Sequence, residues 1–215
     1  MIVTIDGPAA AGKSTVARGL AARLGFEFLD TGAMYRAVTF AAIRRGVPLD
    51  DDAALGELAG SLKISLRGNS VWLDGEEVTV AIRDVAVTRA IRHVADSAPV
   101  RRHMARLQTE AAAGRDMVTE GRDQGTVVFP DAACKIFLTA RPEIRAARRQ
   151  REFATRGQHL SLEQVLADQA ERDRRDASRA IAPMVPAADA VEFDSSDLPF
   201  DQVVDHLEQL ARAAM

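Results

Sequence analysis

The sequence predicts an α/β protein built on a parallel five-stranded sheet flanked by helices. Short apolar segments typical of buried strands alternate along the chain with segments whose apolar residues recur at helical spacing. This alternation indicates a parallel sheet with helices on both faces. The chain has 215 residues, which suits one domain of ordinary size with a real core and room for insertions.

The pattern begins as strand, loop, helix, strand, helix. The β-branched run at 2–5 predicts a buried strand, and a glycine-rich loop separates it from apolar residues at helical spacing over 14–24. A second short strand is predicted at 26–29. A second helix is predicted at 33–45, ending at Gly46, a residue type common just after helix C-termini.

The segment 63–80 departs from this alternation. Short strand-like stretches are separated there by turn dipeptides, Gly-Asn at 68–69 and Asp-Gly at 74–75. We therefore predict a small antiparallel meander, inserted into the α/β pattern.

The alternation then resumes. Helical spacing of apolar residues predicts further helices at 82–95, 100–113, 142–154, 161–176 and 200–213. Apolar runs predict further strands at 117–119, 135–138 and 190–193. The tetrapeptide T-R-G-Q at 155–158 separates two long arginine-rich helices, and we predict that it forms a mobile tip.

The charge balance argues against bulk binding to nucleic acid or to an anionic membrane, because the net charge is −3 and the pI is about 5.8. No stretch approaches the ~20 apolar residues of a spanning helix, and a strand at residue 2 leaves no room for a signal peptide. Cys134 is the only cysteine, so no intrachain disulfide can form. We expect a soluble, cytoplasmic monomer without nucleic-acid or membrane partners, in which Cys134 is a small apolar residue.

A phosphate-binding motif lies between the first strand and the first helix. Gly7 and Gly12-Lys13-Ser14 satisfy G-x-x-x-x-G-K-[ST], in the strand–loop–helix context that the mechanism of a P-loop needs. In such a loop Lys13 reaches the β- and γ-phosphates, the Ser14 hydroxyl coordinates Mg²⁺, and the helix N-terminus favours the anion. The residues expected to bind the donor, ATP, are Gly7, Pro8, Ala9, Ala10, Ala11, Gly12, Lys13, Ser14 and Thr15.

P-loops serve several classes of protein, which other residues must separate. A GTPase would be expected to carry N-K-x-D or T-K-x-D, but no lysine of this chain follows Asn or Thr. An L-S-G-G-Q-like signature of transporter ATPases is also missing, and the chain is short for a motor. Of these classes of P-loop protein, the small-molecule kinases are left.

Three further clusters indicate an acceptor that carries negative charge. They are D-T-G-A-M-Y-R at 30–36, E-G-R-D-Q-G-T-V-V-F-P-D at 120–131 and E-R-D-R-R-D-A-S-R at 171–179. The first two follow predicted strands, at the edge where open α/β sheets bind ligands. Arg36, Arg122 and Arg179 could therefore converge on one crevice, where guanidinium groups would pair with phosphate oxygens.

The absence of histidine from these three clusters agrees with the same chemistry. A nucleoside monophosphate has a phosphate pKa of ~6, so its attacking oxygen is largely ionised at neutral pH and no general base is required. The histidines lie on helical patterns or a loop tip and favour structural or surface roles. The mixed charges at helical spacing in 145–152 and 170–176 likewise favour solvated helix faces for most of those residues.

Together these motifs resemble the bacterial cytidylate kinase family over nearly the whole chain. The resemblance is carried by I-D-G-P-A-A-A-G-K-S-T, D-T-G-A-M-Y-R-A, the inserted meander, G-R-D-Q-G-T-V-V-F-P-D-A, K-I-F-L-T-A, R-D-x-S-R-A-I-A-P and V-P-A-A-D-A. It implies a P-loop core at 1–30, 84–149 and 162–215, a nucleoside-monophosphate-binding (NMP-binding) region at 31–83 that includes the insertion at about 63–80, and a short lid at 150–161.

The resemblance also implies roles for residues on the acceptor side. Thr31 and Arg36 should lie beside the acceptor nucleotide, and Arg122 and Arg179 should grip its phosphate. Arginine suits this role, because a planar guanidinium group can pair with two phosphate oxygens at once.

The remaining implied roles concern the base, the ribose and the transferred group. Arg101 and Asp123 should read the cytosine edge, whose N4 amino group can donate to a carboxylate. Asp176 should face the ribose, and Arg148 and Arg172 should approach the transferred phosphoryl group from the lid side.

The implied function is reversible, Mg-ATP-dependent phosphorylation of CMP or dCMP to CDP or dCDP. Two alternatives stay open, a kinase of another small acceptor such as UMP or dephospho-coenzyme A, and an ATP-hydrolysing regulatory module. Thr31, in place of the more frequent serine, keeps the hydroxyl. Arg92 in I-R-H-V-A stands where many relatives have a serine beside the base, so the preference among CMP, dCMP and UMP stays open as well.

Overall fold

The computed structural model describes residues 1–68, 70–155 and 157–215. These residues form two compact units, the first made of Met1–Phe28 and Arg115–Met215 and the second of Leu29–Gly114. The predicted turn at 68–69 and the predicted tip at 155–158 include Asn69 and Arg156, which lie outside the described residues. No helix within the described ranges has the length and apolar character needed to span a membrane.

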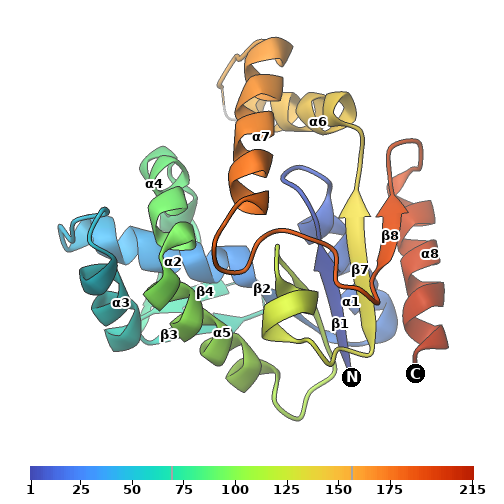
Figure 1. Cartoon of the computed structure of the whole chain (residues 1–215), viewed down its shortest axis with the longest axis horizontal. Coiled ribbons are helices and arrows are strands. Elements are labelled where there is room, and N and C mark those ends of the chain that lie inside the picture. Colours follow the sequence, from blue (N-terminus) through green and yellow to red (C-terminus); the bar gives the residue numbers. More distant parts are fainter. Residues whose placement is uncertain (69, 156) are drawn as a thin grey trace. The chain divides into compact units, whose positions relative to one another are not determined.

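A five-stranded parallel sheet is the centre of the first unit, as predicted (Figure 1). The strand order is β2-β6-β1-β7-β8. The strands are β1 (Ile2–Asp6), β2 (Glu27–Asp30), β6 (Met117–Glu120), β7 (Cys134–Thr139) and β8 (Val191–Asp194). The central strand β1 pairs in parallel with both β6 and β7, which places Ile2 opposite Met117 and Val3 opposite Cys134. Loops that follow β1, β6 and β7 therefore leave the sheet at one edge.

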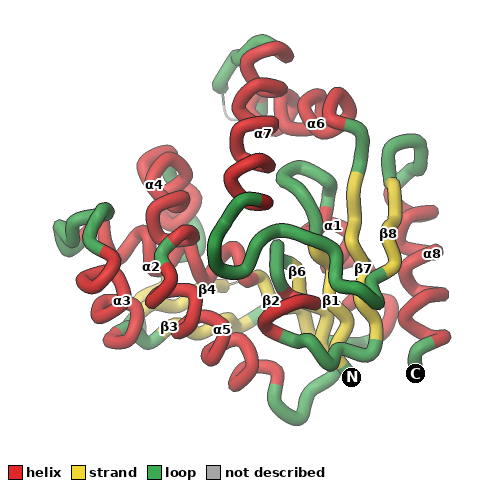
Figure 2. Tube along the Cα trace, viewed as in Figure 1, coloured by secondary structure: helices red, strands yellow, loops and turns green. Residues whose placement is uncertain are grey.

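Four helices accompany this sheet: α1 (Lys13–Leu24), α6 (Pro142–Ala154), α7 (Leu162–Ala177) and α8 (Phe200–Ala213). Helices α1 and α8 pack together, and the apolar face of α8, with Val204 and Leu207 fully buried, joins Leu20, Ile5 and Ile136 in the core. Helices α6 and α7 pack against each other. The chain enters α6 from the end of β7 and runs from α7 to β8 without a regular element (Figure 2).

The second unit combines helices with the predicted antiparallel meander. Its elements are α2 (Thr31–Arg44), α3 (Asp52–Ser61), β3 (Ile64–Arg67), β4 (Ser70–Leu73), β5 (Glu76–Glu77), a 3₁₀ turn (Ala81–Arg83), α4 (Val85–Asp96) and α5 (Ala98–Ala112). β4 pairs antiparallel with β3 and with β5. The antiparallel pairing of these three strands agrees with the meander predicted at 63–80.

The second unit contains one helix that the sequence analysis does not predict. Helix α3 was not predicted, because its ten residues include two glycines that break the helical pattern; the Asp51 carboxylate caps it by accepting from the Ala54 N–H at 2.9 Å. The unit extends to Gly114, because α4 packs against α2 and α5 packs against α3.

Candidate active site

The phosphate loop connects β1 to α1, and two glycines shape it. Gly7 has φ +139°, and a Cβ there would lie 2.0 Å from the Leu138 carbonyl oxygen, so only glycine fits. Gly12, at φ +95°, is the N-cap of α1. The loop therefore ends at a helix N-terminus whose first N–H groups can bind an anion, as the motif predicts.

Lys13 is buried at the start of α1, and its Nζ donates to the Pro8 carbonyl at 2.8 Å. Burial lowers the pKa of this amine to about 7, and the Arg122 guanidinium adds to the effect, while Glu120 opposes it. The ammonium is therefore short of compensating negative charge, which the phosphates of a nucleotide could supply.

Ser14 contacts a buried carboxylate, since its Oγ donates to Glu120 Oε1 at 3.0 Å. Glu120 is the last residue of β6, at the same sheet edge as the phosphate loop. A hydroxyl and a single carboxylate are hard oxygen ligands, and Mg²⁺ is commonly held by one or two such groups together with substrate phosphates. This donor set fits Mg²⁺: it contains Ser14, the ligand expected from the motif, and it adds Glu120, which the sequence analysis does not assign as a ligand.

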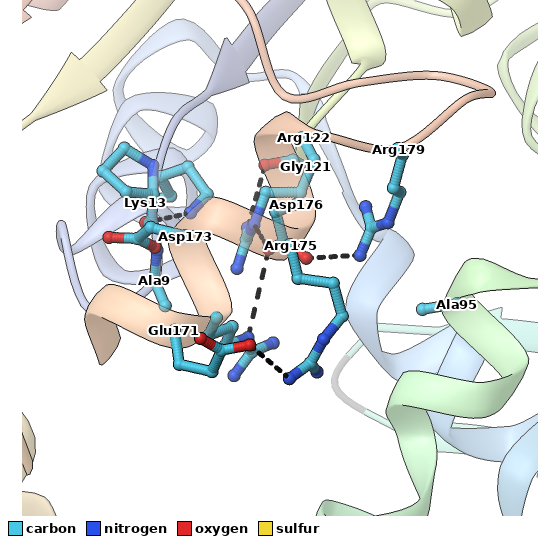
Figure 3. A network of polar contacts seen from close by, with 12 residues as sticks. Ala9, Lys13, Ala95, Gly121, Arg122, Glu171, Asp173, Arg175, Asp176 and Arg179 are labelled. Carbon is cyan, nitrogen blue, oxygen red and sulfur yellow. Dashed lines mark hydrogen bonds and ion pairs between the residues drawn. The ribbon is translucent and has the colours of Figure 1, made fainter. Parts of the chain in front are cut away.

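Asp176, on α7, lies within ion-pair distance of three guanidinium groups, those of Arg122, Arg172 and Arg179, and we call these four residues the arginine cluster. Figure 3 shows Asp176 with Arg122 and Arg179. Asp176 Oδ2 accepts from Arg122 Nε at 3.0 Å and lies 4.0 Å from Arg172 Nε, and Oδ1 accepts from Arg179 Nη2. Burial alone would raise the pKa of Asp176, but Arg122, Arg179 and Arg172 together hold it below its ordinary value. Three cations and one anion leave the cluster positively charged.

The arginine cluster is close to Lys13 within the first unit. The charges of Arg122 and Arg172 both lower the pKa of Lys13. Arg122 also lies two residues after Glu120, which accepts a hydrogen bond from Ser14, the residue next to Lys13. The structure thus brings together five of the predicted site residues: Lys13, Arg122, Arg172, Asp176 and Arg179.

Arg148, on α6, contacts the outer part of the phosphate loop. Its Nη1 donates to the Ala11 carbonyl at 3.3 Å, and its Nη2 donates to the Ser195 carbonyl at 3.0 Å. Burial lowers the pKa of Arg148, so a nearby anion would be favourable. Its contacts are with loop backbone and with the residue that follows β8.

Arg145 and Asp173 contact the loop as well, although their sequence segments favoured solvated faces. Asp173 Oδ1 accepts from the Ala9 N–H at 3.3 Å, and Arg145 Nη1 donates to the Ala9 carbonyl at 3.0 Å. The two side chains also pair with each other at 2.6 Å. Alternating charges on a helix give no signal that separates such a buried pair from its exposed neighbours.

The turn that carries Asp123 is held by a buried carboxylate. Asp6, at the end of β1, accepts from the Gln124 N–H at 2.9 Å and from the Gly125 N–H at 2.7 Å, at the start of a short π-helical turn (Gln124–Val128). Burial raises the pKa of Asp6 to about 6. Asp123 is itself buried at this turn.

The other predicted acceptor residues belong to the second unit. Thr31 is buried at the first position of α2, and Arg36 Nη1 donates to the Ile82 carbonyl at 3.2 Å and to Thr88 Oγ1 at 3.0 Å. Arg101, buried on α5, donates from Nη1 to the Ala95 carbonyl at 2.8 Å, and its guanidinium lies 5.6 Å from the centre of the Tyr35 ring.

Comparison with known proteins agrees with these features. The model of the family described as cytidylate kinase matches residues 3–213. The chain belongs to the cytidylate kinase family. A cytidylate kinase of Pelotomaculum thermopropionicum is 52% identical over 94% of this chain and 92% of its own length. One from Rhodopirellula baltica is 47% identical over 99% of this chain and 93% of its own length.

Solved structures of other kinases share the fold. Shikimate kinase from Bacteroides thetaiotaomicron aligns over 99% of this chain and 98% of its own with a TM-score of 0.53 at 13% identity. A gluconokinase from Sinorhizobium meliloti covers 99% of this chain and 92% of its own with a TM-score of 0.50 at 18% identity. As a member of the cytidylate kinase family, this chain is a nucleoside monophosphate kinase, a phosphotransferase. The comparisons give no support to the alternative of an ATP-hydrolysing regulatory module.

Proposed function

We propose that the protein transfers the γ-phosphoryl group of Mg-ATP reversibly to CMP or dCMP and yields ADP with CDP or dCDP. The observation that carries this proposal is the arginine cluster beside Lys13, because the reaction must bring two polyanions together. Family membership supplies the identity of the acceptor.

On the donor side, the loop amides and the N-terminus of α1 bind the ATP phosphates. Lys13 exchanges its bond with the Pro8 carbonyl for bonds to phosphate oxygens and recovers its full charge. Ser14 and Glu120 are the residues that would hold Mg²⁺, and the ion would neutralise part of the negative charge of the donor.

On the acceptor side, Arg122 and Arg179 bind the phosphate of the monophosphate, and Arg172, with Arg148, stabilises charge on the transferred group. No general base is needed, because a phosphate monoester with a pKa of ~6 is already largely ionised at neutral pH. The site then acts by positioning and charge stabilisation, which is how phosphoryl transfer is generally catalysed.

The proposal includes roles that rest on the family pattern. Asp123 accepts from cytosine N4 and Arg101 donates to the O2 and N3 acceptors, Asp176 faces the ribose, and Thr31 and Arg36 lie beside the acceptor. Residues 31–83 form the NMP-binding region, and a lid at 150–161 closes over the nucleotides and excludes water. We further propose a monomer in the cytoplasm.

Initial rates of ADP formation test this function. Mg-ATP is supplied with CMP, dCMP, UMP, AMP, GMP or dTMP, or without acceptor, and we expect fast turnover with CMP and dCMP only. A rate without acceptor equal to the rate with CMP would contradict the proposal. Turnover with UMP as fast as with CMP would contradict the proposed reading of the cytosine amino group.

A further inference from the structure

Arg145 on α6 and Asp173 on α7 hold one residue of the phosphate loop from both sides. Asp173 accepts the Ala9 N–H through Oδ1 at 3.3 Å, and Arg145 donates to the Ala9 carbonyl at 3.0 Å. Arg145 Nη1 also donates to Asp173 Oδ2 at 2.6 Å. We call this arrangement the Ala9 clamp; Figure 3 shows Asp173 beside Ala9.

The Ala9 clamp is buried and joined to two further parts of the first unit. The side chains of Arg145 and Asp173 are only 9% and 17% exposed. Arg145 Nε donates to the Ala140 carbonyl, just after β7, at 2.9 Å, and the Gln169 side chain of α7 donates to the Arg145 carbonyl at 3.3 Å. A buried ion pair is weak evidence for stability because desolvation offsets its attraction. The well-defined geometry of the Arg145–Asp173 pair therefore needs an explanation other than stability.

The clamp bears on loop geometry at the next residue. Ala10 has φ +59°, the left-handed region that is unfavourable for a residue with a Cβ. Such a conformation costs on the order of 1–3 kcal/mol and persists only where neighbouring contacts enforce it. Bonds to both polar groups of Ala9 fix the preceding peptide units and thus favour the observed path of the loop toward Gly12.

The clamp also bears on the arginine cluster. Asp173 follows Arg172 directly and precedes Asp176 by three residues, so Asp173 and Asp176 share a face of α7. The same helix therefore contacts the phosphate loop through Asp173 and contributes Arg172 and Asp176 to the arginine cluster.

From these contacts we propose that Arg145 and Asp173 are positioning residues for phosphoryl transfer. They hold the phosphate loop and α7 at a fixed spacing, so that Arg172 and the loop-bound phosphates meet in the geometry of the transition state. Neither side chain needs to touch a substrate. The inference rests on the proposed function and adds two residues to its machinery.

The test is Asp173→Asn, which keeps the size of the side chain and removes its charge. Misplacement of reacting groups by about 1 Å can cost on the order of 100-fold in rate, so we expect kcat with Mg-ATP and CMP to fall roughly 10–100-fold. The KM for CMP should change by less than about threefold, because the acceptor residues are unaltered. The kcat of each variant is expressed per folded molecule. The folded fraction and the melting temperature are measured by circular dichroism.

Asp197→Asn is the matched control. Asp197 forms a two-bond ion pair with Arg141, the N-cap of the same helix α6, but the side chains of this pair are 50% (Arg141) and 75% (Asp197) exposed. We expect its kcat to stay within about twofold of wild type. A merely structural role for Asp173 would lower the melting temperature and leave kcat per folded molecule unchanged, which would overturn the inference.

A double-mutant cycle with Arg145→Met provides the second criterion. If the pair acts as a unit, the double variant should lose no more kcat than the worse single variant. A loss of kcat in the double variant equal to the product of the two single losses would overturn the inference. Wild-type protein that fails to phosphorylate CMP contradicts the proposed function and this inference with it, whereas active wild type together with Asp173→Asn at full kcat contradicts this inference alone.

Discussion

The amine of Lys13 is buried against the phosphate loop, and burial, followed by the charge of Arg122, lowers its pKa to about 7. Bound phosphates favour the ammonium form, so the pKa of Lys13 should rise when Mg-ATP binds. At pH 8 binding should therefore take up a fraction of a proton, and the affinity should decrease as the pH rises above 7. Calorimetric titration in two buffers with different ionisation enthalpies measures this uptake.

Lys13→Arg is the control for this proton uptake, because a guanidinium stays charged at every pH used. The variant should bind Mg-ATP without the buffer dependence of wild type. An identical buffer dependence in both proteins would assign the proton to another group and contradict the prediction.

Single residues also show where sequence reasoning stops. Lys13 and Ser14 belong to a local motif with its own mechanism, so their place in the loop could be predicted. Arg145 could not be separated from Arg174: both lie in helices with mixed charges, but the Arg174 side chain is 69% exposed and pairs with Glu171, whereas Arg145 is buried against Ala9. Burial of one charge and exposure of another is decided by how α6 and α7 pack, which neither segment encodes alone.

At the scale of elements, helix packing explains the glycine of α3 that faces α5. A Cβ on Gly56 would lie 2.5 Å from Cβ of Pro99, which cannot rotate away. Overpacking costs typically about 1–3 kcal/mol, and alanine returns about 1 kcal/mol of helix propensity. Gly56→Ala should therefore destabilise the protein by up to about 2 kcal/mol, as measured by urea unfolding.

Gly60→Ala in the same helix is the matched control, because a Cβ there meets nothing within 4 Å. It should be neutral or stabilise the protein by up to about 1 kcal/mol. Equal effects of the two substitutions would show that packing against α5 does not select glycine at position 56.

Most elements could be predicted because each has its own periodicity. Helix α8, with Val203, Val204 and Leu207 on one face, begins and ends where its pattern does. The π-helical turn at Gln124–Val128 had no such pattern, since it depends on Asp6, more than a hundred residues away in sequence, accepting its first N–H groups. Elements defined by tertiary contacts are those that sequence patterns miss.

At the scale of the whole molecule, the pH dependence of stability sums the contributions of every titrating group. The carboxyl groups whose pKa values are lowered in the fold include Glu171, Asp176, Asp189, Asp194 and Asp197. Their stabilisation is present above their unfolded pKa values and is lost as the pH falls. Asp6 acts with the opposite sign, because burial raises its pKa from 3.8 to about 6.

Between pH 3.8 and about 6, the folded protein keeps a proton on Asp6 that the unfolded chain has released, so this group's contribution to stability decreases as the pH rises. Nearby Asp123 raises the pKa of Asp6 further, while the two turn N–H groups and Lys13 lower it. Asp6→Asn removes the titration and leaves the other carboxyl groups in place. The free energy of unfolding of wild type minus that of the variant, from urea unfolding at pH 4 to 8, should fall on the order of 2–3 kcal/mol up to pH 6 and then level off. A difference that stays constant or rises over this interval would show that the Asp6 pKa is not raised by folding, and that the turn before Gly125 is held by a carboxylate already ionised at acidic pH.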